Sequence, residues 1–588
     1  MLITIGEGTC GIAAGAKEVA KLLGERFPQA TFRYVGCLGM CHQEPMVEIR
    51  NGDGKGYLYG NVDRKNLTKI VRFHRGEGPL PEKNFICGSD DPDTEKGSFL
   101  TRQTRIALRN VGQLNPTSFE QFRARGGYAA IEKVLRGGMS PEDVIQEVKI
   151  ANIRGRGGAG FPTAVKWGFA RGAPGYPKYL VCNGDEGDPG AFMDRSLLEG
   201  DPHTVLEGML IAAFAIGASK GYAYIRAEYP LAVDYFGRAI RDAREAGFVG
   251  ENILGSGFSF DLKIKEGAGA FVCGEETALL ASIEGQRGMP RIRPPFPAIQ
   301  GVFGKPTIIN NVETLANIPW IINNGGAAYA AIGTEKSKGT KVFALAGAIR
   351  RGGLVEVPMG MTIRQVLEDV GGGSASSRPL KAVQLGGPSG GCVPESLFDT
   401  IIDYEAINAT GAIMGSGGMV VMDTKSCMVD LARYFLEFTQ IESCGKCTFC
   451  RIGTTRMKEI LTKICDGKGT MEDIATLEEL APQIKNASLC GLGQTAPNPV
   501  LTTLKYFRDE YVAHVKEHRC PGGVCKELIT HTIINKECSG CSICERQCPV
   551  NAITGKVKEP ESWRIDPVVC INCGMCVEVC KPEAILVQ

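Results

Sequence analysis

Two cysteine runs near the C-terminus restrict most strongly what this chain can fold into. The first run, CSGCSICERQCP, begins at Cys538, and the second, CINCGMCVEVCKP, begins at Cys570. Both have the spacing C-x2-C-x2-C-x3-C with a proline close behind. Thiolates spaced in this way let one loop surround a cube of iron and sulfide, and the proline stops the turn from continuing as a helix. This segment is therefore expected to fold around metal clusters.

The spacing is that of bacterial two-cluster ferredoxins, in which the fourth cysteine of each run binds the other cluster. We expect one [4Fe–4S] cluster to take Cys538, Cys541, Cys544 and Cys580. A second [4Fe–4S] cluster is expected to take Cys570, Cys573, Cys576 and Cys548. A structural zinc module is the alternative, but such a module rarely repeats this spacing twice.

The remaining composition indicates a large protein without strong charge. The chain has 588 residues, of which 43% are hydrophobic and 23 are cysteines, and its net charge is +1. This charge argues against a nucleic-acid partner bound by bulk electrostatics. No apolar run reaches the roughly 20 residues that span a bilayer, and the N-terminus lacks the basic part of a signal peptide. We therefore expect a cytoplasmic protein without a membrane segment, whose clustered cysteines bind metal.

Periodicity and composition divide the chain into five segments. Residues 1–80 form a small α/β pattern, followed by a polar linker rich in Pro and Gly. Residues 100–337 alternate strand-like and helical runs, which predicts a layered α/β domain. Residues 338–425 have the pattern of a hairpin and a short helix, as in a β-grasp module, and residues 426–525 have that of a helical bundle. Residues 526–588 are the cysteine-dense tail.

The bundle segment contains a third candidate cluster. Its sequence ESCGKCTFCRIG supplies Cys444, Cys447 and Cys450 from one tight loop, so a fourth ligand has to come from elsewhere. Cys490 lies in a glycine-rich turn between predicted helices and is the natural candidate. A third [4Fe–4S] cluster is expected here, with zinc as the alternative.

The sequence RGRGGAGFPTAVKW, residues 154–167, predicts a ligand-binding loop. Glycines let backbone N–H groups approach a ligand closely, and Lys166 offers a point charge suited to phosphate. The spacing matches neither a Walker motif nor a G-x-G-x-x-G turn. The loop by itself indicates an anionic, planar ligand, and a simple glycine-rich turn is the alternative.

Several motifs together resemble one family. RGRGGAGFPTAVKW, NGDEGDPGAFMDR, GAGAFVCGEETALL, RPPFPA, NNVETL, ESCGKCTFCRIG and LCGLGQTAPNP occur in the order found in the flavoprotein subunit of respiratory complex I. The resemblance covers about residues 100–525. With its front and tail segments, the chain most closely resembles the β subunit of electron-bifurcating [FeFe]-hydrogenases, and related formate dehydrogenase and transhydrogenase subunits share this plan.

The resemblance implies a multidomain fold of α/β and α+β parts. It implies a thioredoxin-like [2Fe–2S] domain, a Rossmann-like domain for FMN and NAD(H), a β-grasp (ubiquitin-like) module, a helical bundle with a [4Fe–4S] cluster and a two-cluster ferredoxin domain. The boundaries are those of the five segments given above.

Site residues follow from the same resemblance. It implies FMN contacts from Gly155, Gly157, Lys166, Asn183, Asp185, Gly274, Glu275, Asn310, Asn311 and Thr314. It implies that NAD(H) is lined by Phe161, Phe169 and Phe296 and is bound by Glu186, Asp188, Glu276 and Arg293. Asp188 stands where complex I has Glu, and Phe271 where it has Tyr. For any one carboxylate, capping of a helix is the alternative role.

The front segment contains three cysteines of the thioredoxin-like pattern. Cys37 and Cys41 have its C-x3-C spacing, and Cys10 precedes them. The family pattern is expected to place a further cysteine about five positions after the first, where this chain has Gly15. A [2Fe–2S] cluster on three thiolates needs His42, a serine or water to complete it. A domain without any cluster is the alternative, because four thiolates are the norm.

A last group of ligand-type residues lies between the bundle and the tail. CPGGVC places Cys520 and Cys525 in a tight turn whose spacing suits tetrahedral zinc. Cys465 ends an earlier predicted helix and His514 lies near the end of the last one, so we expect a closed Cys3His zinc site. His518 and His531 are substitutes for His514. Buried thiols and solvated histidines without metal are the alternative.

We therefore expect an NAD(P)H-dependent flavin and iron–sulfur oxidoreductase subunit of NADH dehydrogenase type. FMN itself performs the hydride transfer, so no side chain is assigned as catalytic. The expected complex is electron-bifurcating and couples NAD(H), ferredoxin and a third partner: H2, formate or NADP(H). Its other subunits would be a catalytic hydrogenase, formate dehydrogenase or transhydrogenase subunit and a small thioredoxin-like [2Fe–2S] subunit. The alternative is an electron-wiring or scaffold subunit of a non-bifurcating NAD-linked hydrogenase or formate dehydrogenase.

Overall fold

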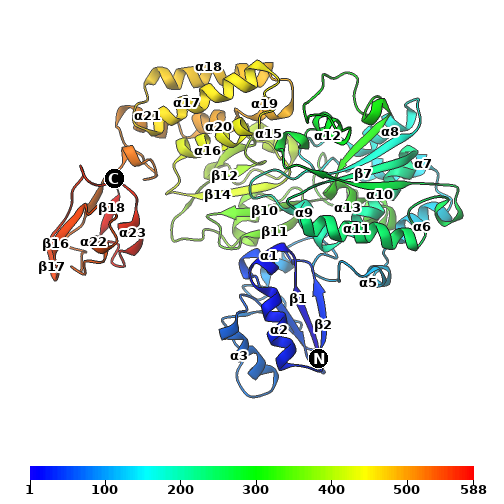
Figure 1. Cartoon of the computed structure of the whole chain (residues 1–588), viewed down its shortest axis with the longest axis horizontal. Coiled ribbons are helices and arrows are strands. Elements are labelled where there is room, and N and C mark those ends of the chain that lie inside the picture. The colour runs from blue at the N-terminus through cyan, green and yellow to red at the C-terminus, as the bar shows by residue number, and fades with distance from the viewer. Residues whose placement is uncertain (588) are drawn as a thin grey trace. The chain divides into compact units, whose positions relative to one another are not determined.

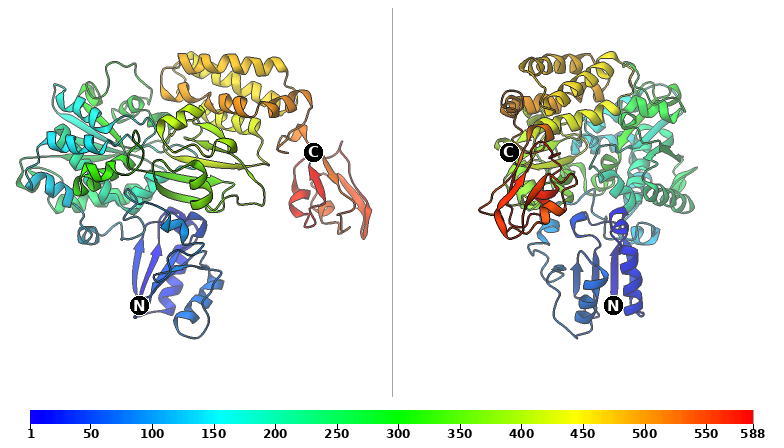
Figure 2. Two further views of the ribbon diagram at one scale, coloured as in Figure 1. Left: turned by 180° about the vertical axis from the view of Figure 1, so that it is seen from behind. Right: turned by 60° about the vertical axis from the view of Figure 1, so that its left-hand side comes forward.

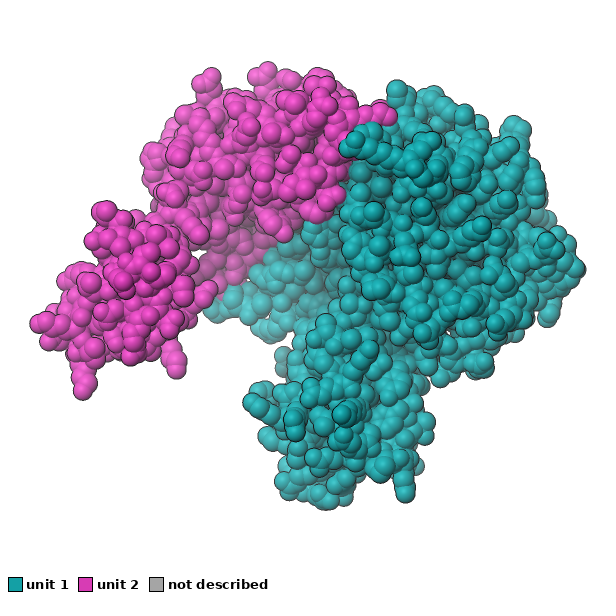
Figure 3. Space-filling view, viewed as in Figure 1, with its two compact units in different colours: residues 1–377, 383–421 teal, residues 378–382, 422–588 magenta. Residues whose placement is uncertain are grey.

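The computed structural model describes residues 1–587, which form two compact units (Figure 3). The first unit comprises residues 1–377 and 383–421, and the second comprises residues 378–382 and 422 onward. Each unit is described separately below. Within the described residues, no helix is both long and apolar enough to cross a membrane.

The first unit begins with a five-stranded sheet in the order β2-β1-β3-β4-β5. β1 and β2 are parallel, and the other neighbours are antiparallel. Ile3 and Ile5 of β1 pack with Val19 and Leu23 of α2, which lies beside the sheet in Figure 1. The elements are β1 (Leu2–Gly6), α1 (Thr9–Ala13), α2 (Ala16–Arg26), β2 (Thr31–Val35), the 3₁₀ turn η1 (Cys41–Gln43), β3 (Val47–Arg50), β4 (Gly56–Tyr59), α3 (Arg64–His74) and β5 (Phe85–Gly88).

A wholly parallel sheet follows, in the order β8-β7-β6-β9. Its strands are β6 (Lys178–Gly184), β7 (Ala218–Arg226), β8 (Asp261–Gly267) and β9 (Thr307–Asn311). The centre of β6 is a continuous buried run, from Tyr179 to Cys182, as expected for a strand that is covered on both faces. Because all four strands point the same way, their carboxyl ends share one edge of the sheet. The predicted alternation of strands and helices is confirmed in this part of the chain.

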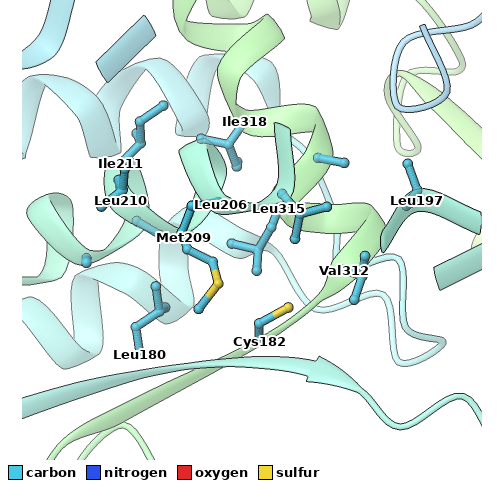
Figure 4. Close-up of a cluster of buried hydrophobic side chains, with 14 of the residues drawn as sticks. Leu180, Cys182, Leu197, Leu206, Met209, Leu210, Ile211, Val312, Leu315 and Ile318 are labelled. Atoms are coloured by element: carbon cyan, nitrogen blue, oxygen red, sulfur yellow. The ribbon is translucent and has the colours of Figure 1, made fainter. Parts of the chain in front are cut away.

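Helices cover this sheet, and α10 is almost entirely buried. Leu206 and Met209 of α10 pack with Leu315 and Ile318 of α13 in the cluster shown in Figure 4, which also contains Leu180 of β6. The helices are α4 (Ser98–Thr101), α5 (Phe119–Ala124), α6 (Ala129–Arg136), α7 (Pro141–Ala151), α8 (Thr163–Gly172), α9 (Met193–Gly200), α10 (Pro202–Ile216), α11 (Pro230–Glu245), α12 (Glu276–Ile283), α13 (Val312–Asn324) and α14 (Gly326–Ala330). The 3₁₀ turns are η2 (Ile253–Gly255), η3 (Phe271–Gly274) and η4 (Val302–Gly304).

A third sheet has the strand order β11-β10-β14-β12-β13. β10 and β11 form the predicted antiparallel hairpin, and β10 also pairs in parallel with β14. The elements are β10 (Thr340–Gly347), β11 (Gly353–Pro358), the π-helical turn η5 (Gln365–Val370), β12 (Leu380–Leu385), β13 (Gly391–Pro394), the 3₁₀ turn η6 (Glu395–Leu397), α15 (Tyr404–Thr410) and β14 (Gly418–Asp423).

The second unit contains a helical bundle with an apolar core that includes Leu436, Met457, Leu461 and Leu477. α18 begins at a capping box, in which the side chain of Thr470 accepts a hydrogen bond from the backbone N–H of Asp473. The helices are α16 (Met428–Ile441), the π-helical turn η7 (Phe449–Gly453), α17 (Thr454–Cys465), α18 (Met471–Ala487), α19 (Gly491–Thr495), α20 (Asn498–Tyr506) and α21 (Arg508–Lys516).

The tail of the second unit, red in Figure 2, is built from short elements. β15 pairs with β18 and β16 pairs with β17, both antiparallel. Trp563 lies in its small core together with the predicted cluster cysteines Cys538, Cys544, Cys548, Cys576 and Cys580. The elements are the 3₁₀ turn η8 (Lys526–Leu528), β15 (His531–Ile533), α22 (Ile543–Arg546), β16 (Ile553–Lys556), β17 (Glu559–Ile565), α23 (Met575–Val579) and β18 (Ile585–Val587).

Candidate functional site

The carboxyl ends of two neighbouring parallel strands bring predicted flavin residues together. Asn183 near the end of β6 pairs in register with Asn311 at the end of β9. The side chain of Asn183 donates to the carbonyl of Gly274 at 3.1 Å and accepts from the backbone N–H of Asp185 at 3.0 Å. Ligands of open parallel sheets bind at this edge, so the predicted polar groups lie where such a ligand is expected.

The glycine-rich loop is held against this edge by a buried arginine, Arg156. Its backbone N–H donates to the hydroxyl of Thr314 at 2.8 Å. Its guanidinium donates to the carbonyls of Arg154, Lys338 and Thr340 and to the hydroxyl of Tyr329, at 2.6 to 3.0 Å. A fully buried guanidinium is stable only with its donors paired, so Arg156 fixes the path of the loop around Gly155 and Gly157. Arg156 lies within the quoted glycine-rich motif, but no role was predicted for it.

The loop glycines allow close approach. Gly158 and Gly160 have φ values of 117° and 62°, in the region that favours glycine, and Gly158 forms an isolated bridge with Gly415. A Cβ at Gly157 would lie 3.0 Å from the Cβ of Asn311. The loop therefore depends on glycine for its own geometry, which agrees with the turn interpretation, and it also lies beside the strand-end asparagines.

Charged residues predicted for both ligands form one connected set. The Lys166 ammonium lies 3.4 Å from a Glu276 carboxylate oxygen, whose other oxygen accepts from Arg293 at 2.6 Å. Lys166 also donates to the carbonyl of Ile309 in β9 at 2.9 Å. Arg293 lies over the ring of Phe296, 5.8 Å from its centroid. The predicted phosphate-binding lysine and the predicted nucleotide-binding pair are thus adjacent.

Three phenylalanines predicted to line the nucleotide are unusually exposed. Phe161, Phe169 and Phe296 are 49%, 57% and 55% exposed. Large exposed aromatic rings next to a polar site are typical of a surface on which a planar ligand stacks.

Some predicted residues also have structural roles. Glu275 caps α12, because one of its carboxylate oxygens accepts from the backbone N–H groups of Thr277 and Ala278, both at 2.9 Å. Asn311 caps α13. Asn310 accepts from the indole of Trp167 at 2.9 Å. Glu275 therefore has the contacts of a helix cap, which is the role considered above as the alternative to ligand binding.

The acidic segment after β6 is buried. Glu186 accepts from the backbone N–H groups of Asp194 and Arg195 at the start of α9, and burial raises the pKa of its carboxyl group. Burial also raises the pKa of Asp188 to about 6, although its hydrogen bond with Ser416 opposes the shift. The ring of Phe271 leaves no room for a side chain at Gly187, where a Cβ would approach within 2.6 Å.

One buried oxygen at this edge is unsatisfied. Oδ2 of Asp194 accepts from Asn311 at 2.7 Å, whereas the buried Oδ1 has no hydrogen-bond partner among the described residues. Burial raises the pKa of Asp194 well above its usual value. A buried carboxyl oxygen left without a partner beside Asn311 fits a ligand with hydroxyl groups, as FMN has.

The bundle brings its four predicted cluster cysteines together. Cys444, Cys447 and Cys490 are all close enough to Cys450 to contribute, after burial, to raising the pKa of its thiol to about 11. The hydroxyl of Ser443 lies 3.2 Å from the Cys450 sulfur. A Cβ at Gly493 would lie 3.1 Å from the Cβ of Cys450, so the glycine-rich turn of Cys490 approaches the first loop closely.

The tail brings cysteines from its two sequence runs together. Cys548 lines a small cavity together with Cys570, Cys573 and Cys576, which is the set predicted for the second tail cluster. Cys541 and Cys580 lie close to Cys544, and these three belong to the set predicted for the first tail cluster. Cys538, the fourth member of that set, lies with Cys544 and Cys580 in the small core of the tail. His531 also lies in this cavity wall and bonds Asn572 at 2.9 Å, so it does not belong to the predicted zinc site.

A compact cluster of buried ligand-type residues lies at the end of the bundle. Ligand atoms of Cys427, His514, Cys520 and Cys525 all lie within 4.8 Å of one another. The Cys427 and Cys525 sulfurs are 3.8 Å apart, and Nε2 of His514 lies 3.3 Å and 3.4 Å from them. Nδ1 of His514 bonds the carbonyl of Glu510 at 2.7 Å, which directs Nε2 toward the sulfurs.

This set differs from the predicted one in a single residue. Cys465 contacts Cys525 but is not among the four residues whose ligand atoms gather, and Cys427 takes its place. Cys427 is the N-cap residue of α16, where the CPGGVC turn approaches so closely that a Cβ at Gly522 would lie 2.6 Å from its backbone N. Cys427 and Cys525 are 98 residues apart, so no local sequence pattern could predict that they lie together.

The front thiols also converge. The Cys41 thiol lies close enough to those of Cys10 and Cys37 to interact with both, and Arg195 donates to the Cys10 sulfur at 3.4 Å. Gly15 does not face them, because a Cβ there would meet nothing within 4 Å. His42 is engaged elsewhere, with Nδ1 2.8 Å from the carbonyl of Gly352 and its ring against Phe99. Gly15 carries no ligand group, and the fourth ligand of the predicted cluster stays a prediction.

These features define a class: a multidomain α/β protein with a flavin-type site, a helical iron–sulfur region and a dicluster tail. Family models match in the same order. Residues 148–320 match the Nuo51 FMN-binding domain, residues 430–514 the NADH-ubiquinone oxidoreductase-F iron-sulfur binding region, and residues 537–584 a 4Fe-4S dicluster domain.

Relatives agree with these matches. The chain is 56% identical over 459 residues to the NADP-reducing hydrogenase subunit HndC of Solidesulfovibrio fructosivorans, covering 78% of this chain and 93% of that one. It is 46% identical over 416 residues to an NADH-quinone oxidoreductase subunit of Rhizobium meliloti, covering 71% and 99%. A chain of the NAD+-reducing [NiFe]-hydrogenase in the H2-reduced state matches with a TM-score of 0.64 at 31% identity, covering 88% of this chain and 84% of that one.

The chain thus belongs to the family of complex I 51-kDa flavoprotein subunits, with a dicluster extension. It is an NAD(P)H-dependent oxidoreductase subunit of the FMN and iron–sulfur type.

Proposed function

We propose that this chain exchanges hydride with a nicotinamide nucleotide and single electrons with its iron–sulfur clusters, within a hetero-oligomeric redox complex. The observation that carries the proposal is the strand-end site, where Asn183, Asn311 and the loop fixed by Arg156 lie together. Bound FMN supplies the conversion between two-electron hydride and one-electron transfer. The names of the relatives, an NADP-reducing hydrogenase subunit and an NADH-quinone oxidoreductase subunit, support membership of such a complex.

In this proposal the chain's residues bind and orient. Lys166 neutralises the flavin phosphate, and Asn183 and Asn311 hold polar groups at the strand ends. The open Oδ1 of Asp194 hydrogen-bonds a ligand hydroxyl. Phe161, Phe169 and Phe296 stack on the nucleotide, and the Glu276–Arg293 pair binds its polar groups. The remaining assigned residues, Gly155, Gly157, Asp185, Glu186, Asp188, Gly274, Glu275, Asn310 and Thr314, shape the two subsites.

The test uses the full chain purified anaerobically with its clusters. We expect about one FMN per chain and bleaching of its absorbance by NADH or NADPH. Lys166→Met should lower FMN retention several-fold, because Lys166 is the one lysine placed beside both Ile309 and Glu276. Lys220→Met, exposed near the amino-terminal end of β7, is the matched control and should retain FMN as the wild type does. A cluster-replete chain that holds no flavin and bleaches with neither nucleotide would refute the proposal.

We propose further that the complex is electron-bifurcating and couples NAD(H), ferredoxin and a third partner, which is H2, formate or NADP(H). The tail supports this, because two ferredoxin-type clusters add a second branch for low-potential electrons. The assembled complex should need ferredoxin for full turnover. Full-rate reduction of its acceptor by NADH alone, indifferent to ferredoxin, contradicts bifurcation. The alternative, a wiring or scaffold subunit, predicts no NADH-dependent dye reduction by the isolated chain.

The fold supports finer domain assignments. We assign residues 1–80 to a thioredoxin-like domain holding a [2Fe–2S] cluster, on the strand order β2-β1-β3-β4 and the convergence of Cys10, Cys37 and Cys41. We assign residues 338–425 to a β-grasp module, on the β10–β11 hairpin and the parallel pairing of β10 with β14. Residues 100–337, 426–525 and 526–588 are assigned to the FMN and NAD(H) domain, the [4Fe–4S] bundle and the two-[4Fe–4S] ferredoxin domain.

We also propose that Cys427, His514, Cys520 and Cys525 bind one structural zinc ion. With Zn–S bonds of about 2.3 Å, tetrahedral thiolates lie about 3.8 Å apart. The Cys427–Cys525 separation of 3.8 Å agrees with this edge length. The bond from Nδ1 of His514 to the Glu510 carbonyl is the outer contact that orients zinc-binding histidines.

Metal analysis of the full chain should find about one zinc. Cys427→Ser and Cys520→Ser should lose it, because each removes one of four ligands. Cys465→Ser is the matched control and should keep it, since Cys465 lies outside the four-residue set. If Cys465→Ser loses the zinc and Cys427→Ser keeps it, Cys465 is the ligand and Cys427 is not. If the fully iron-loaded wild type contains no zinc, the site does not exist.

A further inference from the structure

The front thiol cluster, Cys10, Cys37 and Cys41, has a fourth ligand-type neighbour that the sequence pattern did not indicate. The carboxylate of Glu44 lies close enough to the Cys37 thiol to interact with it. Cys37 in turn contacts Cys41, and Cys41 contacts Cys10. Four ligand groups therefore follow one another in an unbroken series of contacts.

Glu44 has one buried carboxylate oxygen without a hydrogen-bond partner among the described residues. Its side chain is 9% exposed. Oε2 accepts from the backbone N–H of Met46 at 3.1 Å, whereas the buried Oε1 has no hydrogen-bond partner among the described residues. A buried carboxylate oxygen without a partner is costly, and coordination of a cation is one of the few ways to satisfy it.

The backbone around the carboxylate is made of glycine where space is needed. A Cβ at Gly6 would lie 3.6 Å from both Glu44 oxygens, and a Cβ at Gly11 would lie 3.0 Å from Oε2. A Cβ at Gly8 would lie 3.1 Å from the backbone N of Cys37. These three glycines let the loop before α1 approach the thiols and the carboxylate together.

Two arginines lie close enough to offset the charge of a metal centre here. Arg195 donates to the Cys10 sulfur at 3.4 Å. Arg105 is close enough to Cys37 for a direct electrostatic interaction. Nε of each arginine is buried and lacks a hydrogen-bond partner among the described residues. An oxidised [2Fe–2S] cluster with four anionic ligands carries a net charge of about −2, and these two cations offset part of it, although Arg195 also pairs with Glu199 and Arg105 also interacts with Glu356.

We propose that Glu44 is the fourth ligand of the front-domain [2Fe–2S] cluster, completing a Cys3Glu site with Cys10, Cys37 and Cys41. This inference rests on the front-domain cluster that is part of the proposed function. The carboxylate replaces the fourth thiolate of an all-cysteine site, so the number of anionic ligands is unchanged. Glu44 is preferred because its carboxylate lies beside Cys37, whereas Gly15 carries no ligand group and the ring of His42 packs against Phe99.

The test compares full-length variants, reconstituted anaerobically, by iron content and by electron paramagnetic resonance. The reduced [2Fe–2S] signal is recorded at temperatures where fast relaxation broadens [4Fe–4S] signals. Wild type should hold about 14 iron atoms per chain, about 12 of them in three [4Fe–4S] clusters. Glu44→Gln should lose about two iron atoms and the [2Fe–2S] signal. Glu44→Cys should keep both, with shifted g-values and midpoint potential, because a thiolate replaces the carboxylate.

Glu48→Gln is the matched control, since Glu48 pairs with Arg33 and Arg50 in the same sheet and should leave the signal unchanged. A wild type without any [2Fe–2S] signal refutes the front cluster itself, and with it the present inference. A wild-type signal that persists with the same g-values in both Glu44→Gln and Glu44→Cys leaves the cluster in place and overturns the role of Glu44. FMN content, measured on the same samples, tests the flavin site separately.

Discussion

Arg156 shows how one buried side chain determines a loop that is otherwise built from glycine. Its guanidinium bonds three backbone carbonyls and the Tyr329 hydroxyl, and no solvent reaches it. Lysine has no planar fork and cannot make these bonds together. We predict that Arg156→Lys lowers FMN retention by about tenfold or more and lowers the free energy of unfolding by about 3 kcal/mol, as loss of a buried polar network does.

Flavin content after desalting and thermal unfolding measure both effects. Arg171→Lys is the control, because Arg171 pairs with Glu142 at the surface of the same region and should change either quantity little. An Arg156→Lys chain with wild-type flavin content would show that the loop keeps its path without the guanidinium.

At the residue scale, sequence reasoning succeeded where ligands are close in sequence. The cysteine runs at Cys538 and Cys570 and the motif containing Lys166 each carry their own spacing. Arg156 and Cys427 were missed, because each acquires its role mainly through partners far along the chain. Glu44 lies close to Cys37 and Cys41 in sequence and was missed because only cysteine, histidine, serine or water was considered as the fourth ligand. Cys427 meets Cys525 across 98 residues, and Arg156 meets Lys338 across 182. No local pattern encodes such contacts.

At the element scale, a carboxylate of α10 accepts hydrogen bonds from the N-terminal N–H groups of α6. Glu207, almost fully buried, accepts from the backbone N–H groups of Ala130 and Ile131 at 2.9 Å and 3.2 Å. Burial nevertheless raises the pKa of Glu207 from 4.5 to about 7. The folded chain therefore keeps a proton that the unfolded chain releases, and this stabilisation is complete below about pH 4.5 and lost as the pH rises through about 7.

We predict that wild type loses about 1 kcal/mol of stability relative to Glu207→Gln between about pH 6 and pH 8. Glutamine keeps an acceptor for the two N–H groups but does not titrate. Thermal unfolding at both pH values measures the difference. The exposed Glu245→Gln in α11 is the control and should follow wild type. A Glu207→Gln chain whose stability changes with pH as wild type does would exclude this carboxyl group as the cause.

At the scale of the whole molecule, the predicted flavin residues and the predicted tail clusters belong to different units. Cys573 is exposed and shares its cavity with Cys548, Cys570 and Cys576. We predict that Cys573→Ser loses about four iron atoms per chain while NADH-dependent flavin bleaching stays within about twofold of wild type. Iron analysis and anaerobic stopped-flow absorbance measure the two quantities.

Cys87→Ser, in β5 and outside every proposed ligand set, is the control and should keep all its iron. If flavin bleaching falls together with the tail iron, the two units do not act independently in hydride uptake. The sequence supported the order of the segments because each has its own periodicity or spacing. It did not indicate that β12 and β14 belong partly to each unit, since that division depends on packing.

The ligand set Cys427, His514, Cys520 and Cys525 has a consequence for the order of assembly. Cys427 and Cys525 are separated by 98 residues, and the whole bundle lies between them. Bound metal would convert the bundle into a closed ring, and a link across about 100 residues removes about 4.7 kcal/mol of chain entropy from the unfolded state. This ring can close only after Cys525 has left the ribosome, when the first part of the ferredoxin-like tail has already been synthesised, so the bundle is closed late in synthesis.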